Sequence, residues 1–201
     1  HTANRRQRQM CIRDRLSTDP ENPSLHFNRA VLYYNLGLAL SERTDFSEKQ
    51  KLDTIDIVYK TSIESYKTTL QFDPTNDRAV LYLLDAYKAN AKPYYDLERN
   101  LDFLALKNKY QSESERLKNE GNSRISEAKD YAESYLLMKG EEISNEDIAT
   151  VYPIFSILED YDNLINILGI SISRDKTNVE YLEVLRGAYT VSYTHLTLPT
   201  I

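Results

Sequence analysis

The stretch from Thr61 to Tyr87, TSIESYKTTLQFDPTNDRAVLYLLDAY, restricts the fold of this chain more than any other part of the sequence. On both sides of the segment DPTN at 73–76, apolar residues recur at helical spacing, which predicts two helices joined by a short connection. Pro74 disfavours helical geometry at the residue before it and so ends the first helix. A single helical hairpin cannot bury its apolar face, whereas stacked hairpins bury a continuous one. We therefore expect an all-α protein built from stacked helical hairpins.

The preceding part of the chain repeats this design. A turn cluster at 19–23, DPENP, is followed by apolar residues at helical spacing, which predicts a helix over about 23–42 with Ser24 as its N-cap. The segment 45–47 is expected to form a turn, and a second long helical pattern runs to Phe72. Because the clusters at 19–22 and 73–76 share the pattern Asp-Pro-x-Asn, we expect them to delimit one elongated hairpin.

After this hairpin the pattern is less regular. Asp77 is expected to cap a helix through Asn90, and Pro93 to begin another, because its missing N–H is harmless in a first turn. The segment KNKYQSESERLKNE at 107–120 has few residues to bury. It is interpreted as a solvated helical extension, with a mobile linker as the alternative; its alternating charges disfavour a nucleic-acid patch. Gly121 is expected to end this segment, before a helix over 123–139.

The C-terminal part holds another hairpin pattern over 145–178, with a turn at 160–162. Its candidate core residues are Ile148, Val151, Tyr152, Phe155, Leu164 and Leu168. Pro153 lies inside the first predicted helix, where a proline bends or breaks a helix at a cost of about 3 kcal/mol. The segment 179–189 opens a further helix.

These segments resemble one known family of helical repeats. The resemblance is carried by Tyr33-x2-Leu36-Gly37-x2-Leu40, Ser62-x3-Tyr66 and the closing Pro74. They are similar, in that order, to the W-x2-L-G-x2-Y, A-x3-F and P elements of the tetratricopeptide repeat, whose period is about 34 residues. A second frame, shifted by seven residues, puts Ala30 and Tyr33 at the glycine and tyrosine positions and Arg29 at an apolar one.

The resemblance implies antiparallel helical hairpins stacked as a right-handed α-solenoid, a fragment of a longer array of the extended-hairpin bacterial type. Residues 16–110 then hold two tetratricopeptide-like units, the first with elongated helices; 111–144 an irregular helical insert or degenerate repeat; and 145–190 one unit plus the first helix of the next.

The two ends of the chain are related to each other at the level of DNA. When Arg5–Asp14 is written as CGT CGG CAG CGT CAG ATG TGT ATA AGA GAC, the reverse complement translates in frame as VSYTHLTLPT, the sequence of Val191–Thr200. The DNA resembles a transposon-based sequencing adapter. We interpret residues 1–15 and about 190–201 as translated adapter, with 1–15 disordered and 191–201 an artefactual tail. The alternative is a basic N-terminal arm and a short C-terminal strand.

Composition disfavours several kinds of chemistry. Residues 1–15 carry five arginines and one aspartate, so the rest of the chain has a net charge of −10 instead of the −6 of the whole, which disfavours nucleic-acid binding. Between the two ends there is no cysteine, and His26 stands alone, too few residues for a histidine-based metal cluster or triad. No apolar run approaches the roughly 18 residues that cross a membrane. We expect no catalytic, cofactor-binding or metal-binding residues.

The family resemblance implies a function in protein binding, because the first helices of stacked repeats line a groove that holds peptides or partner proteins. By register, the candidate groove residues are Phe27, Tyr34, Asn35, Arg78, Leu81, Asp85 and Lys88. One subgroup of the family clamps the carboxylate end of chaperone peptides. Its clamp positions correspond here to Phe27, Val31, Leu81 and Asp85, which disfavours that ligand.

The sequence therefore favours a protein-interaction scaffold, cytoplasmic or periplasmic, which self-associates if truncated repeat ends expose apolar faces. The alternative is a sensor or regulatory repeat domain of a larger protein whose effector domain is missing. An enzyme is disfavoured, since paired carboxylates such as Asp160 and Asp162, or Glu141 and Glu142, lie in polar turns that do not separate their pKa values.

Overall fold

The structure is a computed structural model that describes residues 2–43, 45, 47–103 and 107–197. Within these residues every regular element is a helix, which confirms the predicted all-α class. The chain divides into two compact units, His1–Ile125 and Ser126–Ile201. In the described part of the chain, no helix combines the length and the apolar character needed to cross a membrane.

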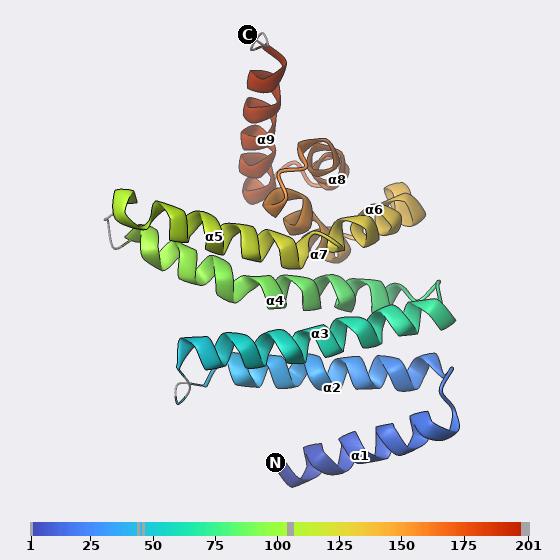
Figure 1. Ribbon diagram of the computed structural model, residues 1–201. Helices are drawn as coiled ribbons and strands as arrows, with labels where there is room; N and C mark the ends of the chain where they lie inside the picture. Colours follow the sequence, from blue (N-terminus) through green and yellow to red (C-terminus); the bar gives the residue numbers. More distant parts are fainter. Residues whose placement is uncertain (1, 44, 46, 104–106, 198–201) are drawn as a thin grey trace. The chain divides into compact units, whose positions relative to one another are not determined.

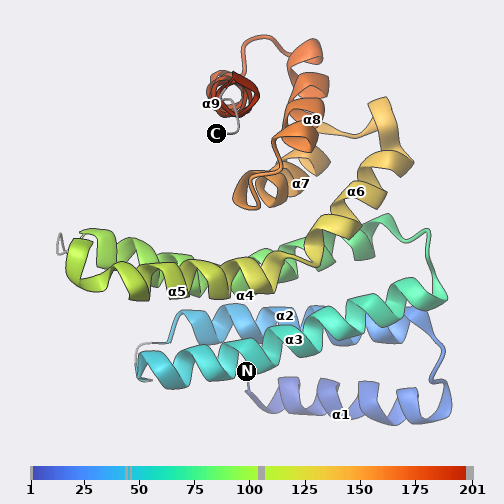
Figure 2. The same ribbon diagram turned by 45° about the horizontal axis from the view of Figure 1, so that its top comes forward.

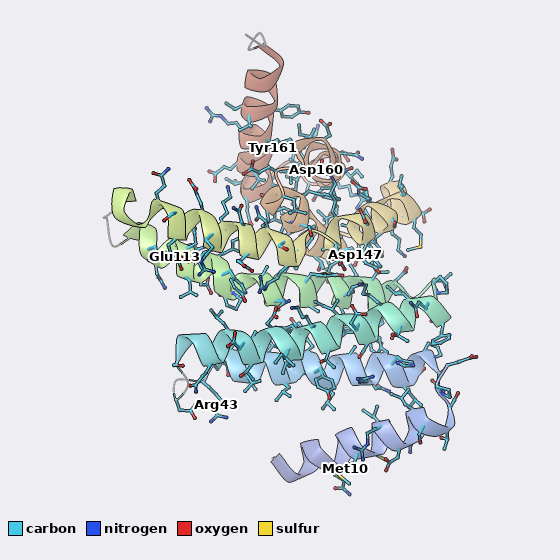
Figure 3. All side chains as sticks on the ribbon, in the orientation of Figure 1. Met10, Arg43, Glu113, Asp147, Asp160 and Tyr161 are labelled. Atoms are coloured by element: carbon cyan, nitrogen blue, oxygen red, sulfur yellow. The ribbon has the colours of Figure 1, made fainter. Side chains whose placement is uncertain are left out.

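The first unit contains two long antiparallel hairpins. Its helices are α1 (Thr2–Thr18), α2 (Pro23–Ser41), α3 (Glu48–Phe72), α4 (Asp77–Phe103) and α5 (Lys107–Ile125). Helix α2 pairs with α3 and α4 pairs with α5, while α3 lies against α4, as Figure 1 and Figure 2 show. The helices of the first hairpin, α2–α3, have 19 and 25 residues, and Arg43 lies at its turn (Figure 3).

An Asp-x-x-Asn connection precedes α2, α4 and the last helix, α9 (Val179–Thr197). In each connection the asparagine side chain accepts a hydrogen bond from the backbone N–H three residues later: Asn22 from Leu25 at 3.2 Å, Asn76 from Ala79 at 3.0 Å and Asn178 from Tyr181 at 3.1 Å. These bonds satisfy a donor that the first helical turn leaves unpaired. The predicted caps Ser24 and Asp77 were therefore wrong, because the asparagines before them cap these helices instead.

The second hairpin departs most from the sequence prediction. Helix α4 runs for 27 residues straight through Pro93, where we expected a new helix to begin. The buried Ala91 and Tyr94 on either side hold α4 against its neighbours, and this packing outweighs the loss of one backbone hydrogen bond. Helix α5 then covers 107–125, so 107–120 is the partner helix of α4 and no mobile linker. Gly121 lies inside α5 instead of ending it, and the helix expected over 123–139 begins only at Ala128.

Small residues bring the helices of each hairpin close together. A Cβ atom at Gly37 of α2 would lie 2.6 Å from the ring of Tyr59 on α3, and one at Gly121 of α5 would lie 2.7 Å from the ring of Tyr95 on α4. Since such distances are shorter than van der Waals contact, both positions need glycine. In the first hairpin, the buried Ser62 hydroxyl also donates to the Ala30 carbonyl at 2.8 Å across the helix pair.

One arginine connects the two hairpins. The guanidinium carbon of Arg124 on α5 lies 3.9 Å from the ring centroid of Tyr94 on α4. The same guanidinium reaches α3, where its Nε lies 3.1 Å from Asp56 Oδ1, and it pairs with Glu120 at 2.5 Å within α5. Because Arg124 and Asp56 are largely buried, this pair is screened less by solvent than a surface pair would be.

Helix α1 lies against α2, in place of the disorder expected for residues 1–15. The half-buried Ile12 and Leu16, together with Leu32 and Tyr33 of α2, line a hollow of about 430 Å³ between the two helices. The origin of this segment as translated adapter stays a prediction. His1 and the end of the expected tail, 198–201, lie outside the described residues.

The second unit contains α6 (Ala128–Lys139), the short 3₁₀ helix η1 (Gly140–Glu142), α7 (Asn145–Ile157), α8 (Tyr161–Arg174) and α9. Helices α7 and α8 form the hairpin expected over 145–178, and Phe155 and Leu168 are fully buried between elements of this unit. Pro153 lies inside α7 without ending it. Asp160, labelled beside Tyr161 in Figure 3, caps α8 by accepting from the Asn163 N–H at 3.3 Å.

The glycine contact gives a direct test of helix packing in the first unit. We expect Gly37→Ala to lower the free energy of unfolding by about 1–3 kcal/mol, because the added methyl group meets the Tyr59 ring, which is 1% exposed and cannot move aside. Gly169→Ala in α8 is the control: nothing lies within 4 Å of the place that its Cβ would occupy, so we expect stabilisation by about 0.5–1 kcal/mol. Urea unfolding followed through NMR signals of each unit measures both. A stabilising Gly37→Ala would contradict the close packing.

Candidate partner-binding site

A cluster of aromatic and charged side chains lies where α2, α3 and α4 meet. We call it the α2–α4 seam and define it as Phe27, Tyr34, Tyr66, Tyr82, Arg78 and Asp85. Phe27 and Tyr34 are seven residues apart on α2, and Arg78, Tyr82 and Asp85 follow at helical spacing on α4. The seam therefore results from two amphipathic helices that contact each other across α3.

The aromatic rings form one continuous contact. Phe27 packs edge-on against Tyr66 with ring centroids 5.7 Å apart, and it lies at the same distance from Tyr82. Tyr66 and Tyr82 are stacked at 6.2 Å. Contacts of this geometry contribute about 0.5–1.5 kcal/mol beyond the area they bury. Tyr66 is the fully buried member of the seam and forms its floor, whereas Phe27 is half-buried and Tyr82 is 37% exposed.

Arg78 lies over this aromatic surface. Its guanidinium carbon is 5.6 Å from the centroid of Phe27 and 5.9 Å from that of Tyr82, both within the range of a cation–π contact. The side chain is exposed in the first turn of α4. Within the described residues, no carboxylate forms an ion pair with Arg78. The seam thus has a positive group at one end that no carboxylate of the described residues pairs with.

The other end of the seam contains Asp85 and the tyrosines near it. Burial raises the pKa of Tyr34 to about 12, with the negative charge of Asp85 as the next cause. Burial likewise raises the pKa of Tyr66, with smaller effects from Tyr82 and Asp85. Asp85 also forms an ion pair with Lys88 at 2.8 Å. The tyrosines are therefore neutral hydrogen-bonding groups near neutral pH, and the charge of Asp85 is balanced by a neighbour.

The structure brings together most of the residues predicted from register. Phe27, Tyr34, Arg78 and Asp85 belong to the seam, with Lys88 paired to its acidic end, and Leu81 is half-buried on the same helix. Asn35 lies apart from them, since it lines a hollow of about 370 Å³ between α1 and α2 together with Cys11 and Arg15. It is one residue past Tyr34, and a step of one residue turns a helix by about 100° away from the seam.

Sequence reasoning missed Tyr82 as a site residue and treated Tyr66 only as a repeat position. The spacing of Tyr82 four residues after Arg78, which puts both on one helical face, was the available signal. Nothing in the sequence indicated that Tyr66 would be the buried floor of the site, because that requires the position of α3 beneath both α2 and α4.

Two buried tyrosine hydroxyls differ in their hydrogen bonding. The hydroxyl of Tyr66 has no hydrogen-bond partner among the described residues. Burial raises the pKa of Tyr59, in the same hairpin, and an interaction with the Ser41 side chain acts to lower it; the Ser41 hydroxyl itself donates to the Gly37 carbonyl at 2.9 Å. A buried polar group without a hydrogen-bond partner lowers the free energy of unfolding. The Tyr66 hydroxyl, at the floor of the seam, is therefore expected to make the protein less stable than a phenylalanine there would.

A further hollow, of about 630 Å³, lies between α3, α4 and α5. Leu97 and Leu117 supply apolar lining, and Arg116 lies at its rim. Its arginines are already paired within the protein, Arg116 with Glu113 at 2.6 Å and Arg124 with Asp56 and Glu120. This hollow therefore offers less uncompensated charge to a partner than the α2–α4 seam does.

Among the carboxylates considered for catalysis, Asp160 has a structural role. Partial burial acts to raise the pKa of Asp160, but hydrogen bonds from Lys129 at 2.9 Å and from Asn163 hold it below its usual value. Asp160 is thus an ionised helix cap. Within the described residues, no group of three or more His, Cys, Asp or Glu side chains is arranged to hold a metal ion.

In comparisons with models of known protein families and with curated protein sequences, the chain matches no family model and no curated protein. The site is therefore interpreted from its own geometry.

The two buried hydroxyls give a paired prediction. We expect Tyr66→Phe to leave the free energy of unfolding unchanged or to raise it by up to about 1 kcal/mol, because it removes a polar group that has no partner. Tyr59→Phe should lower it by about 0.5–1.5 kcal/mol, because it removes a buried hydroxyl that interacts with Ser41. Urea denaturation of the two variants and the wild type measures both. Equal destabilisation by the two variants would show that the Tyr66 hydroxyl has a partner after all.

Proposed function

We propose that the protein is an interaction scaffold that binds a peptide segment of a partner protein on the α2–α4 seam. In this proposal α2–α3 and α4–α5 are successive units of a solenoid of the tetratricopeptide type, with α2 and α4 as the first helices that line its groove. Two long hairpins stacked through α3 and α4, and a further hairpin of the expected length at α7–α8, support this arrangement.

The observation that carries the proposal is the composition of the seam. Interfaces are enriched in tyrosine and arginine, which contribute a large share of binding energy when they lie centrally. The seam presents a partly exposed Tyr82 and a half-buried Phe27 beside an arginine that pairs with no carboxylate in the part of the chain that the structure describes. The rings are held by Tyr66 from below, so their positions are fixed before a partner arrives and little conformational entropy is lost on binding.

A random-peptide display library, selected on the full chain, tests the proposal because it requires no identified partner. Peptides that are recovered would be synthesised and their affinity measured by fluorescence anisotropy. We expect Tyr82→Ala to weaken binding by at least about tenfold, as truncation of an interface anchor does. The matched control is Tyr189→Ala on α9, which removes the same side chain at 45% exposure from a surface outside the seam.

We expect the control to change affinity by less than about twofold, as do substitutions at residues outside the anchor positions of an interface. Failure to recover any binding peptide, or binding that depends on Tyr189 and is indifferent to Tyr82, would contradict the proposed function. Circular dichroism of each variant shows whether the helices are retained, so that a loss of affinity is attributed to the side chain.

A further inference from the structure

We propose that Arg78 makes the α2–α4 seam selective for a peptide that carries an acidic side chain, with an apolar side chain two residues away. This inference rests on the proposed function and goes further, because it states the chemistry of the peptide. It is carried by the placement of the guanidinium over two rings, by its lack of a carboxylate partner and by the exposed apolar surface beside it.

The geometry leaves the hydrogen-bonding edge of Arg78 available. A guanidinium is planar, with its N–H donors arranged around the edge of the plane and none on its faces. The guanidinium carbon lies 5.6 and 5.9 Å from the ring centroids of Phe27 and Tyr82, and within the described residues the Arg78 donors form no ion pair with a carboxylate. The donors on the edge match the two oxygens of a carboxylate, and such a charge-assisted pair is shorter and stronger than a neutral hydrogen bond.

The charges around Arg78 leave its guanidinium able to bind an anion. Asp85 is the carboxylate of the seam, and it is paired with Lys88 instead of Arg78. Asp77, the residue before Arg78, has an interaction of its own with another group. Arg78 also lies in the first turn of α4, where the unpaired N–H groups of a helix favour negative charge.

The rings beside Arg78 define the second element of the peptide. Side chains at positions i and i+2 of an extended peptide lie on the same face, roughly 7 Å apart. The centroids of Phe27 and Tyr82 lie 5.6 and 5.9 Å from the Arg78 guanidinium carbon, so a carboxylate on Arg78 places the next side chain of that face over the aromatic surface. An apolar or aromatic side chain there removes the exposed part of the Tyr82 ring from water, and burial of apolar surface favours binding. A polar side chain at the same place contributes less.

We favour a side-chain carboxylate over the carboxylate at a peptide's C-terminus. A terminal carboxylate would end the peptide at Arg78 and leave one direction of the seam unused, whereas an internal acidic residue allows the peptide to continue toward Tyr34 and Asp85. Lys88, the cation at that end, is already paired with Asp85, so the expected peptide carries its acidic group near the Arg78 end of the bound segment.

The same display selection tests this inference through the sequences it recovers. Selection on the full chain should enrich Asp or Glu two positions from an apolar or aromatic residue, and selection on Arg78→Gln should lose that enrichment. For a recovered peptide, acetylated at its N-terminus and amidated at its C-terminus, we expect Arg78→Gln to weaken binding about ten- to a hundredfold. Arg78→Lys should restore part of the affinity, since it keeps the charge but loses the planar fork.

Arg99→Gln is the matched control, an exposed arginine on the same helix, and it should change the affinity by less than about twofold. Replacing the acidic residue of the peptide by its amide should have no further effect on Arg78→Gln. Peptides that bind through Tyr82 but show no acidic preference would overturn this inference and leave the proposed function intact. Preference for a free C-terminal carboxylate over the amide would overturn it as well, and recovery of no peptide would contradict both.

Discussion

The close approach of paired helices, permitted by glycine beneath a tyrosine ring, is the constraint on which the first unit depends. Gly37 under Tyr59 and Gly121 under Tyr95 each sit where a Cβ atom would overlap the ring. The glycine lies on the first helix of one hairpin and on the second helix of the other, so the two hairpins achieve close packing by opposite arrangements. These contacts allow long helices to pack along their length. Because α4 and α5 pack against each other in this way, α4 continues through Pro93 and α5 continues through Gly121.

The α2–α4 seam follows from this packing. Two hairpins that each hold a fixed spacing, joined by Arg124 between α5 and α3, leave α2 and α4 as neighbours over α3. Phe27 and Tyr82 then meet over the buried Tyr66. A buried aromatic floor thus supports a partly exposed aromatic surface, and Arg78, which pairs with no carboxylate of the described residues, lies over it.

Much of the fold could be predicted from the sequence, but little of its tertiary detail. The Asp-x-x-Asn connections were visible because their chemistry is local: Asn76 caps the helix it precedes, whatever packs around it. The predictions at Pro93 and Gly121 were wrong for the opposite reason. Both residues disfavour a helix by local preference, but packing against a partner helix stabilises the helix that contains each of them. Within the candidate site, register put Phe27 and Arg78 on one surface, and the structure shows their side chains in contact. Asn35 lies apart from them because one residue of offset turns a side chain to another face of the helix.

Helix α4 continues through Pro93 and helix α5 through Gly121, and the two helices pair as one long hairpin. Amide hydrogen exchange of the full chain, resolved residue by residue by NMR, tests it most directly. We predict that the amides of 122–124 are protected to about the same extent as those at 113–117, with exchange slowed by roughly a thousandfold or more, because all belong to one packed helix. Unprotected amides at 122–124, with protection resuming only in the following helix, would show that Gly121 ends the helix and would contradict the hairpin.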